Sequence, residues 1–160
     1  MEQEPISAPV EPPRGIYPGR VDEKGRLKLP AAFQQYLESM GEKKVFVTTL
    51  DVRIVRIYPI SRWKENEIFF EAKNDDPAAA EDLAFIANDF GADSELDGQG
   101  RVLIPPQLRR TLGIENQPVW LDAYKGRINV YGKEIYDERR RRAMEGLQDK
   151  LRNLEKAGLK

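Results

Sequence analysis

The feature that most constrains the fold of this chain is an internal repeat. Residues 21–37 (VDEKGRLKLPAAFQQYL) resemble residues 96–112 (LDGQGRVLIPPQLRRTL). A second match follows along the chain, between residues 45–59 and residues 119–132. The identities in the first match are Asp22 with Asp97, Gly25 with Gly100, Arg26 with Arg101, Pro30 with Pro105 and Leu37 with Leu112. Self-similarity of this kind predicts one small structural module present twice.

Each copy of the D-x-x-G-R motif predicts a tight turn followed by a strand. Asp22 and Asp97 can accept backbone N–H groups at the start of the turn, and Gly25 and Gly100 suit a position with positive φ. We therefore assign these four residues to turn structure. Pro30 then ends the strand and suits the first turn of a helix, and Pro105 does the same in the second copy. Two further strands are expected in each copy, at 45–49 and 53–58 and at 118–123 and 127–131.

The repeat and the segments around it predict the organisation of the whole chain. A module of about 45 residues buries too little surface to fold alone, so the two copies are expected to share a core. Apolar spacing in the connector predicts two helices broken near residues 74–77, and Met144, Leu147, Leu151 and Leu154 predict a long C-terminal helix. The expected parts are a disordered Pro-rich tail (1–13), the first module (14–59), a helical connector (60–91), the second module (92–132) and the C-terminal helix (133–160).

Composition narrows the function. The 160 residues include no cysteine and no histidine, which removes the thiol nucleophile and the commonest general base. Acidic pairs at residues 75–76 and at Asp89 and Asp93 could hold Mg²⁺, but they resemble loop and helix-end residues. We therefore expect no enzyme and no cofactor. No apolar run approaches the ~18 residues of a membrane span, and a cytoplasmic location is the simplest interpretation.

Charge is distributed unevenly along the chain. The net charge is −1, which disfavours a generic nucleic-acid binder. Residues 14–30 nevertheless carry five basic and two acidic side chains, a local charge of +3. The five basic residues are Arg14, Arg20, Lys24, Arg26 and Lys28. The second copy is poorer in basic residues, because Gln99 replaces Lys24. We expect the first copy to contact DNA and the second to be mainly architectural.

The doubled motif resembles the MraZ family of bacterial regulators, over about residues 14–142. Arg14-Gly15 is similar to the family's opening, residues 22–30 to its first motif and residues 97–105 to its second. The resemblance implies an α+β fold of two tandem AbrB/SpoVT-like swapped-hairpin modules, which form an intrachain pseudo-dimer barrel with connecting helices and a C-terminal helix. It also implies ring-like homo-oligomers, nucleoid association, and binding to short direct repeats in double-stranded DNA upstream of the operon for cell division and cell-wall synthesis.

The resemblance implies that Arg26 contacts DNA, and Arg101 occupies the corresponding place in the second copy. An alternative is that Arg26 and Arg101 pair with Asp22 and Asp97 and only brace the two turns. An alternative for the whole chain is an AbrB-like, antitoxin-type interaction module that binds a partner protein through its C-terminal helix. For the regulator, weak contacts at each turn are expected to be multiplied by self-association.

Overall fold

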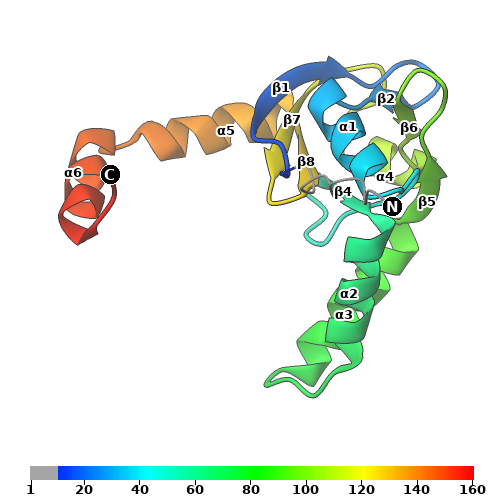
Figure 1. Ribbon diagram of the computed structural model, residues 1–160, viewed down its shortest axis with the longest axis horizontal. Helices are drawn as coiled ribbons and strands as arrows, with labels where there is room; N and C mark the ends of the chain where they lie inside the picture. The colour runs from blue at the N-terminus through cyan, green and yellow to red at the C-terminus, as the bar shows by residue number, and fades with distance from the viewer. Residues whose placement is uncertain (1–10) are drawn as a thin grey trace, which may run out of the picture.

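The computed structural model describes residues 11–160, and it is an α+β structure built on antiparallel strands (Figure 1). Most of the Pro-rich tail predicted for residues 1–13 lies outside the described residues. The larger sheet has the strand order β1 (Gly15–Arg20), β7 (Pro118–Tyr124), β8 (Arg127–Gly132), β4 (Val55–Pro59), β3 (Lys44–Thr48) and β5 (Ala92–Glu95). A second, two-stranded sheet pairs β2 (Arg26–Lys28) with β6 (Arg101–Leu103).

The two halves of the chain exchange strands throughout this fold. β1 of the first half pairs with β7 of the second, and β5 of the second half pairs with β3 of the first. The strands β4 and β8 meet in the middle of the large sheet, where Arg56 lies opposite Asn129. The counterparts in the two halves are β1 and β5, β2 and β6, β3 and β7, and β4 and β8. Exchanging the strands of each pair gives the same two strand orders, read from the opposite edge. The repeat is therefore preserved in three dimensions as an approximate twofold relation.

The larger of two apolar cores lies between the large sheet and the short helices of the two halves. Residues of β7 alternate between this core and the outer face, as a strand with one covered face requires, whereas four consecutive residues of β3 are buried. Val119, Leu121 and Ala123 of β7 are buried, for example, while the residues between them are partly exposed. The helices α1 (Ala31–Ser39) and α4 (Pro106–Thr111) contribute the buried Phe33 and Leu108. The predicted helices after both turn motifs are confirmed.

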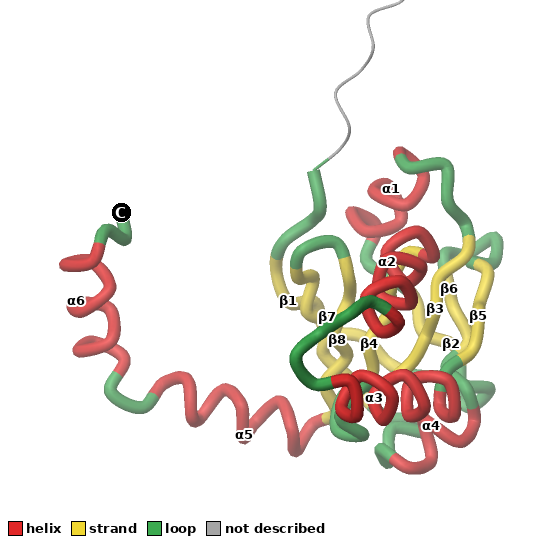
Figure 2. Tube along the Cα trace, turned by 90° about the horizontal axis from the view of Figure 1, so that it is seen from below, coloured by secondary structure: helices red, strands yellow, loops and turns green. Residues whose placement is uncertain are grey.

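The connector forms the predicted pair of helices, α2 (Ile60–Glu71) and α3 (Pro77–Phe90), which run beside each other away from the sheet (Figures 1 and 2). Asp76 caps α3, since its side chain accepts a hydrogen bond from the N–H of Ala79 at 3.1 Å. The base of the pair is tied to β3. Trp63 stacks on Phe46, with ring centroids 4.5 Å apart, and the hydroxyl of Thr48 donates to the carbonyl oxygen of Ala87 at 2.6 Å.

The C-terminal segment differs from its prediction. The expected single helix is divided into α5 (Lys133–Met144) and α6 (Leu147–Ala157). The break falls at Gly146, whose φ is +60° and therefore interrupts the helical hydrogen bonding. Stacking of Tyr136 on Trp120, with centroids 4.6 Å apart, holds the start of α5 against β7. Beyond it, both views show an arm that leads away from the rest of the molecule (Figures 1 and 2).

None of the helices in the described part of the chain has the length and apolar character that crossing a membrane requires.

Candidate nucleic-acid interface

The two D-x-x-G-R turns adopt the same conformation, held by the aspartate at the start of each. The carboxylate of Asp22 accepts the N–H of Lys24 at 3.0 Å and that of Arg26 at 2.8 Å. Asp97 accepts the N–H groups of Gln99 and Arg101, each at 2.9 Å. Both turns are closed by the N–H of their glycine, Gly25 or Gly100, which donates to the aspartate's carbonyl oxygen. The turn-structural role predicted for these four residues fits this geometry.

These hydrogen bonds keep the two aspartates ionised. The backbone N–H of Arg26 is the main reason why the pKa of Asp22 lies below its ordinary value of 3.8, and the side chain of Arg26 and the N–H of Lys24 act in the same direction. The N–H of Arg101 lowers the pKa of Asp97 in the same way. Each turn therefore carries a fixed negative charge beside its arginine.

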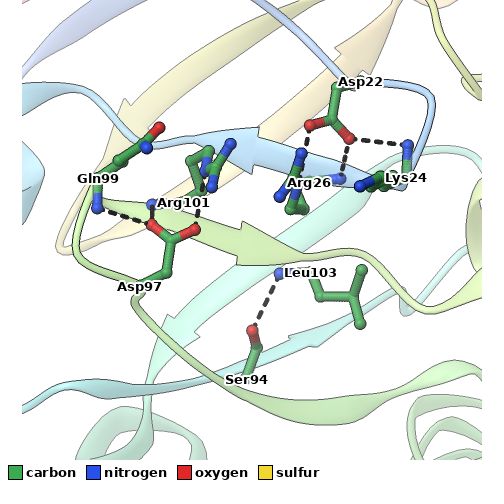
Figure 3. A network of polar contacts seen from close by, with 8 residues as sticks. All are labelled: Asp22, Lys24, Arg26, Ser94, Asp97, Gln99, Arg101 and Leu103. Atoms are coloured by element: carbon green, nitrogen blue, oxygen red, sulfur yellow. Dashed lines mark hydrogen bonds and ion pairs between the residues drawn. The ribbon is translucent and has the colours of Figure 1, made fainter.

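Each arginine is braced by its aspartate, as the alternative interpretation of the motif expects. The Nε of Arg26 lies 2.9 Å from Oδ2 of Asp22, and the Nε of Arg101 lies 2.8 Å from Oδ2 of Asp97 (Figure 3). Side-chain exposure is 35% for Arg26 and 24% for Arg101. Among the described residues, neither arginine donates a hydrogen bond from its terminal Nη atoms. Bracing thus fixes the orientation of the guanidinium group and leaves its terminal Nη atoms available as donors.

The two turns lie at opposite ends of one antiparallel ribbon, which β2 and β6 form by pairing with each other (Figure 3). Leu27 and Val102 lie opposite each other on the inner face, and both are buried. The outer face carries the alternate residues, which are Arg26, Lys28, Arg101 and Leu103. Lys28 lies directly opposite Arg101. Like charges at this separation repel each other unless an anion lies between them.

Two residues that the sequence did not single out hold the ribbon in place. Gln34 of α1 donates to the carbonyl oxygen of Leu29 at 2.8 Å, and its amide group fills the space above Gly100. Arg109 of α4 donates to the carbonyl oxygen of Ile104 at 2.7 Å, and its guanidinium group fills the space above Gly25. Gln34 and Arg109 are counterparts within the aligned segments 21–37 and 96–112, but the two residues differ in type, so the identities in the alignment did not single them out.

The other basic residues predicted for the site are not all brought to this ribbon. Lys24 lies exposed in the first turn. Arg20 ends β1 and donates to the carbonyl oxygen of Asn116 at 2.8 Å. Arg14 precedes β1 and pairs with Glu11 at 3.1 Å. Six extended residues separate Arg14 from the turn, a distance of about 20 Å. The outer ribbon face therefore excludes Arg14 and includes Arg101, so the geometry does not divide the copies into one that binds and one that is architectural.

One residue of each acidic pair weighed as a metal ligand has a structural contact instead. Asp76 caps α3, and Asp93 lies 3.8 Å from the Nζ of Lys44. Within residues 11–160, no group of three or more carboxylates, histidines or cysteines has the geometry of a metal site.

Comparisons with known proteins agree with the motif resemblance. A family model described as "MraZ protein, putative antitoxin-like" matches residues 91–155. A protein of Acidobacterium capsulatum named "Transcriptional regulator MraZ" is 36% identical over 126 residues, which cover 78% of this chain and 79% of that protein. Proteins of the same name from Koribacter versatilis (36% over 105 residues, covering 65% and 71%) and Anaeromyxobacter dehalogenans (34% over 129 residues, covering 78% and 86%) also match.

Proposed function

The chain belongs to the MraZ family, and we propose that it is a transcriptional regulator that binds double-stranded DNA through the outer face of its β2–β6 ribbon. The relatives are named as regulators of transcription and not as enzymes. The residues that we assign to DNA contact are Arg26, Lys28 and Arg101 on the ribbon, with Lys24 at the tip of the first turn and Arg20 at its base.

The observation that carries this proposal is the placement of three cations on one face of a two-stranded antiparallel ribbon. The major groove of B-DNA is wide enough to accept such a ribbon. Lys28 and Arg101 lie side by side across the strands, and a phosphate between them would replace their repulsion by two attractive contacts. The ribbon also explains how a chain of net charge −1 can bind DNA, because the cations are gathered at one place.

The residues of the ribbon have different roles in this proposal. Asp22 and Asp97 orient the arginines through Nε, so the terminal nitrogens form a preset fork for a phosphate or for the acceptor edge of guanine. Leu103, which is 48% exposed between the charged side chains, offers an apolar contact of the kind that reads a thymine methyl group. Contacts of Lys28 and Arg101 with phosphate position the ribbon, and the fork of Arg26 together with Leu103 supplies sequence preference.

The finer features implied by the family resemblance belong to the same proposal. The exchange of β1 and β5 between the halves is the topology expected of two fused swapped hairpins. One copy offers one small ribbon, so tight binding requires several copies on successive direct repeats. Linking sites in this way raises avidity by roughly 10²–10⁴. A closed ring of copies acting at the nucleoid, on the repeats upstream of the cell-division and cell-wall operon, satisfies this requirement.

Fluorescence anisotropy with a labelled duplex from upstream of the protein's own operon tests the proposal. We expect Arg26→Ala, Lys28→Ala and Arg101→Ala each to weaken binding about tenfold, since one lost ionic contact to DNA costs about 1–3 kcal/mol. Lys73→Ala is the matched control, because Lys73 is an exposed cation in the loop between α2 and α3. Equal affinity of the three ribbon variants and the wild type would exclude the ribbon as the DNA contact.

A further inference from the structure

The helix α6 has an apolar face with no covering in the described chain. Leu147, Leu151 and Leu154 follow the i, i+4, i+7 spacing of one helix face, and each is at least 50% exposed. Every residue of α6 is exposed, and both views place the helix at the end of the arm, away from the sheet (Figures 1 and 2). Three exposed leucines at this spacing are the anchors typical of a helix that docks in an apolar groove.

The same chain contains a groove of suitable character between α2, α3 and the edge of the large sheet. Its volume is about 1060 Å³. The aromatic rings of Phe46, Trp63 and Phe70 form successive contacts along it. Phe85 of α3 also lines the groove and is 69% exposed, which is unusual for so large an apolar side chain. An occupant that covers Phe85 would bury most of this surface.

The charges around the groove and on α6 are complementary. The side chains lining the groove include four acidic and two basic residues, which are Glu67, Glu71, Asp89, Asp93, Lys44 and Lys64. Residues 147–160 carry the opposite balance, with Lys150, Arg152, Lys156 and Lys160 against Asp149 and Glu155. A C-terminal segment (147–160) with a net charge of +2 would therefore approach a groove with a net charge of −2, with apolar residues at the centre of both surfaces.

We propose that α6 of one copy docks in the α2–α3 groove of a second copy of this chain. The arm leads away from its own groove, because the stacking of Tyr136 on Trp120 fixes the start of α5 and α5 itself is about 18 Å long. The helix and the groove are different surfaces, so each copy gives its α6 to one neighbour and receives the α6 of another. Contacts of this head-to-tail kind build rings or filaments.

This inference deepens the proposed function, since a head-to-tail assembly presents many ribbons to one DNA, but its test requires no DNA. Size-exclusion chromatography with light scattering on the full chain compares the wild type with Leu151→Asp and Phe85→Asp. We expect the wild type to exceed the 18.4 kDa of one chain and both variants to elute as monomers. Asn153→Asp is the matched control: it adds the same charge to α6 away from the leucine face, and it should assemble like the wild type.

Mixing the two variants distinguishes docking of α6 in the groove from other modes of self-association. Leu151→Asp retains an intact groove and Phe85→Asp retains an intact α6, so an equimolar mixture should form a dimer of one copy of each and nothing larger. Assembly by Phe85→Asp alone would overturn the proposal, because α6 would then bind another helix or another protein. A wild type that is monomeric at all concentrations would also overturn it. Leu154→Asp, in which a second exposed leucine is changed, should reproduce the effect of Leu151→Asp and excludes a local folding defect.

The outcomes of the two tests are independent. If assembly fails to depend on Leu151 and Phe85 while the ribbon variants still lose DNA affinity, only the docking proposal is wrong. If the head-to-tail dimer forms but the ribbon variants bind DNA normally, only the proposed function is wrong.

Discussion

Replacing Gly25 by alanine tests whether the two halves hold each other's turns. Gly25 has a φ of +84°, a conformation that costs an alanine about 1–2 kcal/mol. The added Cβ would also collide with the guanidinium group of Arg109, which would have to move. Moving it breaks the partly buried hydrogen bond from Arg109 to the carbonyl oxygen of Ile104, at a cost of about 1–3 kcal/mol. The expected loss is therefore about 2–5 kcal/mol in the free energy of unfolding.

Gly41→Ala separates the two contributions. Gly41 also has a positive φ, +68°, but no atom lies within 4 Å of the position that its Cβ would occupy. This control should lose only the conformational part, about 1–2 kcal/mol. Urea denaturation followed by circular dichroism gives both values, provided that the dependence of the unfolding free energy on urea is the same for both variants. If Gly25→Ala is no more destabilising than Gly41→Ala, the interlock between Arg109 and the first turn does not stabilise the fold.

Three further changes test other parts of the structure. Phe33→Ala should lower the free energy of unfolding by about 3–5 kcal/mol in urea denaturation, because Phe33 is fully buried between the halves; a loss below about 1 kcal/mol would contradict the shared core. Thr48→Val should cost about 1–3 kcal/mol in the same assay, since it leaves the carbonyl oxygen of Ala87 without its donor, and hydrogen exchange should show faster opening of α3. Because the pKa values of Asp22 and Asp97 are lowered in the folded state, their contribution to stability is complete above the unfolded pKa of 3.8 and is lost as the pH falls through the folded values. The double variant Asp22→Asn, Asp97→Asn should therefore flatten the dependence of Tm on pH below about 4. A pH profile of Tm unchanged from the wild type would contradict this.

The local elements of this fold could be predicted from the sequence, because their signals are local. The glycine and aspartate of each turn, the proline before α1 and α4, and the break between α2 and α3 all act on their own neighbours in the chain. The predicted strands agree with β3, β4, β7 and β8 to within two residues. The prediction of one long C-terminal helix was wrong because the leucine spacing continues across Gly146. A single glycine inside a helix costs only about 1 kcal/mol in the absence of packing, so the sequence did not indicate a break there.

The pairing of the strands could not be predicted in the same way. The sequence of β1, GIYPGR, has no alternation of apolar residues, and nothing in it indicates that its partner is β7 of the other half. The ribbon depends on that long-range pairing, since only the β2–β6 register places Arg101 beside Lys28. Sequence reasoning named Arg26 and Arg101 as candidate DNA contacts while expecting the second copy to be mainly architectural, and it did not identify Leu103, Gln34 or Arg109.

The central claim is that both halves contribute cations to one DNA-binding ribbon, and the salt dependence of DNA affinity tests it most directly. Each phosphate neutralised by the protein contributes about −0.9 to the slope of log K against log salt concentration. We predict that Lys28→Ala in the first half and Arg101→Ala in the second half each make the slope less negative by about 0.9 for every copy bound to the duplex, because these two residues face one phosphate across the ribbon. A slope unchanged from the wild type in both variants would contradict the claim.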